Sequence, residues 1–244
     1  MDICSAGLWP NKDTKTWSEL DHITHETLKI LLCAATPHEL HGWHCADDTY
    51  ADVQPISNNP TEHQLYAVST GVGVAYTALR LAPLAPAYDL VLNVGLAGAY
   101  SPQLVIGDVV RVAHEVLADY GIDDNGTFVP LHQSGLRAFA PAPMELNGPP
   151  CPHLPAVRAI TVSTVSGSAE LIRSNIARWH PDIETMEGAA VALVCQRLNV
   201  ELLCIRAISN RVEPRNPNTW NTATALANLH RATLHLLTQL PPRP

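Results

Sequence analysis

Charged residues are scarce in this chain of 244 residues, and the basic ones are outnumbered. They make up 16% of the chain, with 15 Lys and Arg against 23 Asp and Glu, so the formal net charge is −8. Such a chain has no broad basic surface for nucleic acid or an anionic membrane. No apolar run approaches the roughly 20 residues that span a bilayer. We therefore expect neither a nucleic-acid partner nor a membrane partner.

Disulfide and targeting signals are also lacking. The six cysteines form no CxxC motif, and several lie in apolar runs, where a free cysteine behaves as a small buried hydrophobe. The N-terminus has the early acid Asp2 and neither a basic segment nor an apolar core, so it does not have the pattern of a signal peptide. These features predict a cytoplasmic protein with reduced thiols.

Metal and dinucleotide motifs are incomplete. His38 and His41 are one residue short of the HExxH spacing, and no added carboxylate or cysteine pattern accompanies them or His44. The glycine loop at residues 70–73 would need Gly or Ala at position 76 to complete GxGxxG, and Tyr76 stands there. We expect no metal and no cofactor, although the loop's backbone amides could still hold an anion or a polar oxygen.

Hydrophobic residues, in contrast, make up 46% of the chain and fall into short runs. Such runs typify strands that are buried on both faces, and helical segments separate several of them. This alternation predicts an α/β fold with helices on both faces of a mostly parallel sheet. Residues 1–27 are expected to form a poorly ordered extension and residues 28–240 a single domain, with a proline-rich loop at 141–155. The expected strands are residues 30–35, 64–70, 89–93, 108–113, 157–162 and 200–208, and the expected helices are 74–82, 168–179, 187–198 and about 218–240.

One segment near the C-terminus concentrates polar side chains at strand ends. Met186 and Glu187 precede a nearly uncharged helix, and the next strand carries Arg206 and then Asn210. Glu187 could simply charge the helix N-terminus, and Asn210 could stabilise a turn. A buried arginine needs a partner, however, and ligand sites in such sheets lie beyond the carboxyl ends of the strands. The segment therefore indicates a functional site.

Six motifs in order resemble the purine nucleoside phosphorylase and nucleosidase superfamily over residues 28 to about 240. They are KILLCAATPHEL (29–40), STGVG (69–73), NVGLAGA (93–99), IGDVV (106–110), TMEGAAVALVC (185–195) and IRAISN (205–210). VEPRN at 212–216 points within it to the futalosine hydrolases of the menaquinone pathway. The resemblance implies a three-layer αβα sandwich with a central mixed sheet, cleavage of a nucleoside's N-ribosidic bond, and a homodimer or higher homo-oligomer.

The resemblance also implies roles for individual residues. Glu39 would activate the attacking water as a general base, with Arg206 close by. Met186 would pack on the sugar, and Glu187 would accept hydrogen bonds from the ribose hydroxyls. The remaining substrate-binding residues would be Thr70, which stands where related nucleosidases carry serine, together with Gly71 and Gly98.

The chain departs from the adenosine-type nucleosidases at Asn210, where they carry an aspartic acid that protonates N7 of the purine. An amide offers both an N–H donor and a C=O acceptor, and we expect this pairing to suit N7 and O6 of hypoxanthine. The loop at 36–39 lacks the arginine of phosphorylases, and Glu39 would repel phosphate. Hydrolysis that releases hypoxanthine is thus favoured over two alternatives, a methylthioadenosine/adenosylhomocysteine nucleosidase and a purine nucleoside phosphorylase.

Two further expectations concern the rest of the substrate and a second subunit. Arg211 or Arg215 could bind the benzoate of futalosine, since arginine pairs bidentately with carboxylates. The alternative for Arg215 is an exposed pair with Glu213. A subunit contact is expected around residues 115–123.

Overall fold

A computed structural model describes residues 27–240, so the expected extension at residues 1–27 lies almost wholly outside the described part. The helices are α1 (Val74–Leu81), α2 (Ala169–Trp179), α3 (Gly188–Leu198) and α4 (Thr222–Gln239). A nine-stranded sheet is built from β1 (Lys29–Ala34), β2 (Gln54–Pro55), β3 (Gln64–Ser69), β4 (Leu90–Ala99), β5 (Val109–Leu117), β8 (Met144–Glu145), β9 (Ala156–Thr161), β10 (Ile183–Thr185) and β11 (Glu201–Arg211). A separate hairpin consists of β6 (Gly121–Asp124) and β7 (Thr127–Pro130).

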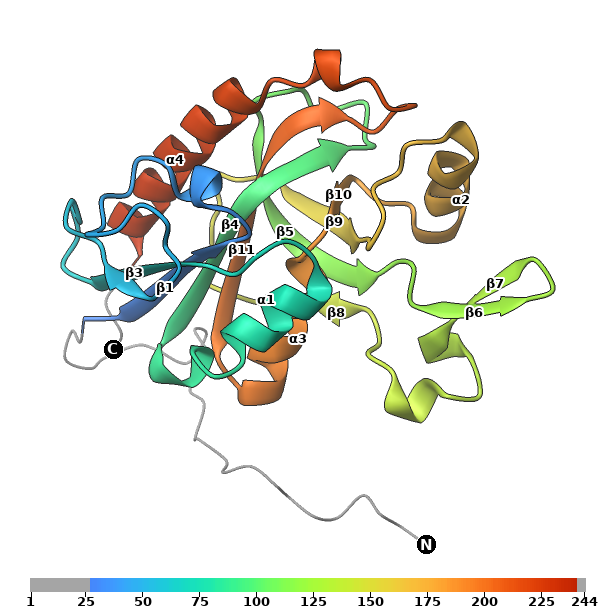
Figure 1. Ribbon diagram of the computed structural model, residues 1–244, viewed down its shortest axis with the longest axis horizontal. Helices are drawn as coiled ribbons and strands as arrows, with labels where there is room; N and C mark the ends of the chain where they lie inside the picture. Colours follow the sequence, from blue (N-terminus) through green and yellow to red (C-terminus); the bar gives the residue numbers. More distant parts are fainter. Residues whose placement is uncertain (1–26, 241–244) are drawn as a thin grey trace, which may run out of the picture.

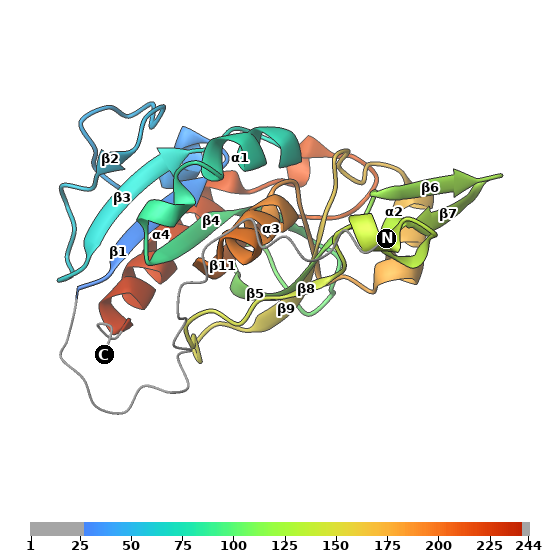
Figure 2. The same cartoon turned by 90° about the horizontal axis from the view of Figure 1, so that it is seen from below.

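Helices cover both faces of this sheet (Figures 1 and 2). Along β1, Leu31 and Cys33 belong to the hydrophobic cluster that includes α3, whereas Ile30 and Leu32 belong to the cluster that includes α4. Successive side chains of a strand point to opposite faces, so a run that is apolar at every position buries both. The predicted three-layer α/β sandwich with a central mixed sheet is confirmed.

At one end the sheet closes on itself. The first half of β4 pairs in parallel with β1, but Gly98 and Ala99 near its end pair antiparallel with β10. Because β10, β9, β5, β11 and β4 are then linked in a ring, these strands form a small barrel. The sequence did not predict β10, because a three-residue strand is too short to show a period.

The predicted helices and strands are present, with shifted ends. Ser168 is the N-cap of α2, and its side chain accepts a hydrogen bond from Leu171 N at 3.2 Å. Helix α4 starts at Thr222 rather than near 218, because residues Pro217–Thr219 form a separate 3-10 turn and Asn221 caps the helix. The proline-rich segment 141–155 is a loop apart from the two residues of β8, which pair with β5.

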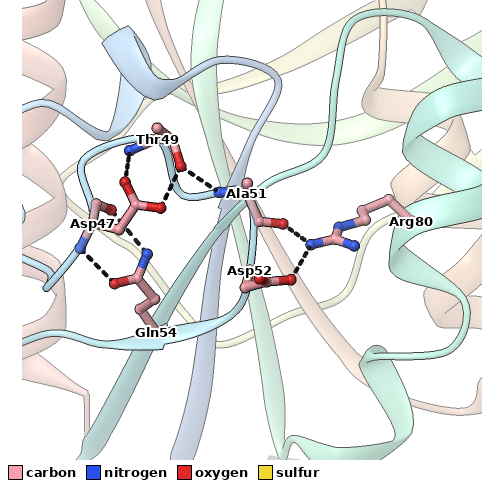
Figure 3. A network of polar contacts seen from close by, with 6 residues as sticks. All are labelled: Asp47, Thr49, Ala51, Asp52, Gln54 and Arg80. Atoms are coloured by element: carbon pink, nitrogen blue, oxygen red, sulfur yellow. Dashed lines mark hydrogen bonds and ion pairs between the residues drawn. The ribbon is translucent and has the colours of Figure 1, made fainter.

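Surface segments complete the molecule. The hairpin of β6 and β7 projects beside α2, away from the sheet (Figures 1 and 2). A turn at residues 47–54 is tied to α1 by Arg80, which donates to the carbonyl of Ala51 and forms a 3.5 Å ion pair with Asp52 (Figure 3). Because Asp52 is almost fully exposed, this ion pair adds little stability.

Candidate active site

A cavity of about 430 Å³ opens at the carboxyl ends of the central strands. Segments that follow the strands meet here, because β1, β4 and β11 run parallel and end at the same edge. Seven of the candidate residues line it, namely Glu39, Gly98, Met186, Glu187, Asn210, Arg211 and Arg215. Arg206, Thr70 and Gly71 do not belong to its lining.

Glu39 lies on a 3-10 turn, Pro37–Leu40, directly after β1. Its Oε2 accepts hydrogen bonds from the backbone N and the hydroxyl of Thr36, both at 2.9 Å, and its Oε1 accepts one from Leu96 N at 3.0 Å. The Glu39 Oε1 atom approaches the backbone so closely that a Cβ on Gly95 would stand 2.8 Å from it. A carboxylate fixed by three donors at a cavity wall can orient and deprotonate a water molecule.

Glu187 precedes α3 but does not cap it with its side chain. Its Oε1 instead accepts a 2.9 Å hydrogen bond from Gly73 N, in the glycine loop before α1. Burial raises the pKa of Glu187, while the Gly73 bond and Arg206 act in the opposite direction. Glu187 thus lines the cavity and holds the glycine loop, although it also stands at the N-cap position of α3, where a negative charge favours the helix.

Arg206 is buried beneath the cavity, with 2% of its surface exposed. Its guanidinium donates to the carbonyl of Asn93 at 3.1 Å and also to the Asn93 side chain. Burial alone would lower the pKa of Arg206, but Glu187, Glu115 and Glu39 are among the groups that raise it, and the net direction is upward. Arg206 therefore supplies a fixed positive charge under the two carboxylates of the cavity.

Glu115 is a buried carboxyl that the sequence placed in an exposed contact segment. It lies on β5 and is fully buried, so it does not contribute to a surface between subunits. Its Oε1 accepts from Thr161 Oγ1 at 3.1 Å, whereas no partner among the described residues reaches its Oε2. Burial raises its pKa to about 7, partly offset by Arg206. The register of β5 shifts between Val112 and His114, so the alternation of residues 109–113 would have placed Glu115 on the less buried face.

Asn210 lies within β11, next to a register shift between Ile208 and Asn210. Its Oδ1 accepts from Ser209 Oγ at 2.8 Å, and its Nδ2 donates to the carbonyl of Arg211 at 2.9 Å. A Cβ on Gly98 would stand 3.1 Å from Asn210 Nδ2, so the glycine makes room for the amide. One N–H and one lone pair of the amide remain for a ligand.

The two arginines after Asn210 differ in how many hydrogen bonds their guanidinium groups make. Arg211 donates to the carbonyls of Ser101, Leu104 and Tyr100, which uses three of its five N–H donors. Arg215 is exposed at the cavity rim, and its guanidinium carbon lies 5.9 Å from the ring centre of Trp220.

Glu213 accepts a hydrogen bond from Thr219 at 2.9 Å, and no ion pair between Arg215 and Glu213 occurs in the described residues. Arg215, whose guanidinium makes no hydrogen bond to the described residues, therefore has more donors available for a ligand than Arg211, which uses three of its five.

Thr70 and Gly71 lie beside the cavity. The Thr70 hydroxyl donates to the carbonyl of Ala34 at 3.1 Å, and Gly71 N donates to the carbonyl of Ala35 at 3.0 Å. These bonds fasten the glycine loop to the end of β1, so the loop can present Gly73 to Glu187. The sequence also missed Glu184, which lines the cavity from β10.

The comparisons agree with this geometry. The family model of the phosphorylase superfamily matches residues 56–238, and the chain belongs to that superfamily. Futalosine hydrolase of Thermus thermophilus is 34% identical over 181 residues, which cover 70% of this chain and 80% of that one. The 5'-methylthioadenosine/S-adenosylhomocysteine nucleosidase of Shewanella oneidensis is 27% identical over 209 residues, 81% of this chain and 89% of that one. The chain is accordingly an enzyme, an N-glycosyl hydrolase.

A solved structure shares the fold. The methylthioadenosine/adenosylhomocysteine nucleosidase of Colwellia psychrerythraea, in complex with adenine, superposes with a TM-score of 0.72 at 21% identity, covering 91% of this chain and 99% of that one. Within residues 27–240 no helix is long and apolar enough to cross a membrane, and no three His, Cys, Asp or Glu side chains are grouped as a metal site.

Proposed function

We propose that the enzyme hydrolyses futalosine in menaquinone biosynthesis and releases hypoxanthine. One observation carries this proposal: Asn210 presents an amide, not a carboxylic acid, to the cavity that Glu39 and Glu187 line. An amide cannot give a full proton to N7. Because N7 and O6 are both acceptors, it is the remaining N–H of Asn210, the one not bonded to the carbonyl of Arg211, that can donate to them. A base that leaves as an oxo-stabilised anion needs less protonation than adenine does.

The residues of the cavity fit hydrolysis of the N-ribosidic bond. The bonding electrons leave with the base, and an oxocarbenium-like sugar forms in the transition state. Water adds to the anomeric carbon and gives a proton to Glu39, which three hydrogen bonds keep in place. Glu187 accepts from the ribose hydroxyls, Met186 packs on the sugar, and Arg206 supports the carboxylates from below. The base returns to neutrality by taking a proton from solvent.

The distal end of futalosine would lie at the rim of the cavity. Arg215 is exposed there beside Trp220, and its donors are not used by backbone carbonyls as those of Arg211 are. A guanidinium and an aromatic ring side by side suit a benzoate, because the first pairs with the carboxylate and the second packs on the ring. Arg215→Ala is expected to raise the KM for futalosine about tenfold and leave kcat unchanged; an unchanged KM contradicts this assignment.

The test is chromatography of the products from futalosine, inosine and methylthioadenosine, each incubated with and without phosphate. We expect hypoxanthine from futalosine at a rate that does not depend on phosphate. Adenine released from methylthioadenosine at a higher kcat/KM would instead favour the adenosine-type activity named for the Shewanella relative. A requirement for phosphate would favour a phosphorylase.

A further inference from the structure

Asn93 is a buried polar residue that the proposed mechanism does not use. It lies within β4, with 2% of its surface exposed, at the start of the motif NVGLAGA (93–99). It pairs in register with Cys33 of β1 on one side and with Cys204 of β11 on the other. Residues in register share a face of the sheet, so an amide and two thiols form one row across three central strands. A buried amide destabilises the fold unless its polar atoms are paired, so the contacts of Asn93 indicate its role.

The hydrogen bonds of Asn93 fix the orientation of its amide. Nδ2 donates to the carbonyl of Cys33 at 3.0 Å, so Oδ1 faces the other neighbouring strand. There Oδ1 accepts a hydrogen bond from Arg206 Nη2 and one from Cys204 Sγ at 3.3 Å. The backbone carbonyl of Asn93 accepts from Arg206 Nη1 at 3.1 Å. Two oxygens of one residue thus hold two nitrogens of the guanidinium.

The guanidinium of Arg206 is held by neutral groups. Among residues 27–240, the only other acceptor is the carbonyl of Ile205, at 2.9 Å, and Arg206 forms no ion pair. The thiols beside Asn93 are neutral too, because burial raises the pKa of Cys33 to about 12 and that of Cys204 to about 11. The row beneath the cavity therefore fixes the guanidinium without offsetting its positive charge.

That charge acts on the carboxylates around it. Glu39 reaches Arg206 from the turn after β1, Glu115 from β5 and Glu187 from the start of α3. Burial would lower the pKa of Arg206, but Cys204 and these three carboxylates together raise it. Burial also raises the pKa of Glu187, and Arg206 acts in the opposite direction. The ionisation of Glu187 therefore depends on where the guanidinium stands.

We propose that Asn93 is a positioning residue that holds Arg206 in place and leaves its positive charge to act on Glu39 and Glu187. This rests on the roles that the proposed function gives to these two carboxylates. A Cβ on Gly95 would stand 2.8 Å from Glu39 Oε1 and 3.7 Å from Arg206 Nε, so both side chains approach one position over β4 where no side chain stands. A displaced guanidinium would lose this alignment, and a shift of about 1 Å can cost about a hundredfold in rate.

Two substitutions at Asn93 separate the hold from the charge. Asn93→Asp keeps an acceptor for Arg206 but adds a negative charge that offsets the guanidinium. The pKa of Glu187 should then rise, and the acidic limb of kcat/KM against pH should move up by about one unit. Asn93→Leu removes the acceptor and keeps the positive charge, so kcat should fall about tenfold or more while the limb stays near its wild-type position. A folded Asn93→Asp variant whose acidic limb coincides with that of the wild type would overturn the proposal.

A double-mutant cycle tests the same link without a new buried charge. Arg206→Met removes the guanidinium, so in that background Asn93→Leu should lower kcat by less than about threefold. Equal costs of Asn93→Leu in both backgrounds would show that Asn93 does not act through Arg206, and the proposal would fail. Thr233→Val, which removes a buried hydroxyl bonded to the carbonyl of Leu229 in α4, is the control and should leave both kcat and the limb unchanged.

The choice of substrate keeps this test apart from the proposed function. All rates are measured on whichever of futalosine, inosine and methylthioadenosine the wild type hydrolyses fastest, after urea denaturation has shown that each variant is folded. Failure of futalosine as a substrate would refute the proposed function, whereas the comparison of Asn93 variants would stand on the other nucleoside.

Discussion

At the scale of single residues, the site depends on carboxylates held by backbone donors. Glu39 is fixed by Thr36 and Leu96, and Glu187 by Gly73. Backbone N–H groups are held by the fold, so they orient a carboxylate without the entropy loss of a second flexible side chain. The buried guanidinium of Arg206 supplies the opposing charge. This arrangement predicts that the two carboxylates fail in different ways when they are changed.

Glu39→Gln should remove turnover and keep binding. The amide retains the shape of the carboxylate but cannot accept the proton of the attacking water, so kcat is expected to fall by about 10²–10⁴-fold. The dissociation constant for the substrate, measured by calorimetry, should change less than about threefold. Glu145→Gln, on an exposed side chain of β8, is the control. Turnover near the wild-type rate would show that Glu39 is not the base.

Glu187→Gln should weaken the discrimination between ribosides and 2'-deoxyribosides. The carboxylate must be ionised to accept from ribose hydroxyls, and burial raises its pKa. Activity of the wild type should therefore rise with pH through this raised pKa, at a higher pH than for an ordinary carboxyl. Profiles of kcat/KM against pH test this, and the variant should lack that acidic limb. If the kcat/KM profile of the variant shows an acidic limb at the same pH as the wild type, a group other than Glu187 is responsible for it.

Sequence reasoning named residues at or near the ends of strands, and these line the cavity. Glu39, Met186, Glu187 and Asn210 stand in motifs at strand ends, and parallel order brings such ends together. Sequence reasoning did not identify Glu184, because the pairing of β10 with β4 joins segments that are far apart in the chain. No local pattern records such a contact.

At the scale of elements, the start of α3 is held by hydrogen bonds to two threonines. Gly188 N donates to Thr185 Oγ1 at 3.3 Å, and Ala189 N donates to Thr161 Oγ1 at 2.8 Å. The Thr161 hydroxyl in turn donates to Glu115. These bonds satisfy the N-terminal amides that an α-helix leaves unpaired, and they set the direction of Glu187.

Gly188→Ala should therefore destabilise the protein and impair catalysis. A Cβ at this position would stand 2.1 Å from Glu115 Oε2, an overpacking that costs about 1–3 kcal/mol. That cost outweighs the gain of up to about 1 kcal/mol that alanine brings to a helix. Urea denaturation and kcat/KM measure the two effects. Gly135→Ala, where a Cβ meets no atom within 4 Å, is the matched control; equal stability of the two variants would contradict the packing argument.

Long elements were predictable and short ones were not. Runs such as that of β1 are apolar on both faces, and α2 carries its cap in the sequence. Strands β4, β5 and β11 extend beyond their predicted ends, because glycine, histidine and asparagine interrupt the apolar pattern where they approach the site. The functional end of the sheet is thus the part that propensity describes least well.

At the scale of the whole molecule, the buried Glu115 links stability to pH. Its pKa in the folded protein is about 7, above the ordinary 4.5, so the folded state keeps its proton while the unfolded state loses it. The free energy of unfolding should therefore fall by up to about 3 kcal/mol as pH rises from 4.5 to 7 on account of this group. In urea denaturation across that range, the free energy of unfolding of Glu115→Gln should depend less on pH than that of the wild type. The same pH dependence in both proteins would contradict this role of Glu115.

The central claim is that the enzyme releases hypoxanthine from futalosine with water as the nucleophile. The most direct measurement is a competition, in which futalosine, inosine and methylthioadenosine are present at equal concentration with inorganic phosphate, and both bases and sugars are quantified by chromatography. We predict that hypoxanthine forms ahead of adenine, matched by the free sugar product of futalosine and no sugar phosphate. Predominant adenine, or a sugar 1-phosphate, would contradict the account.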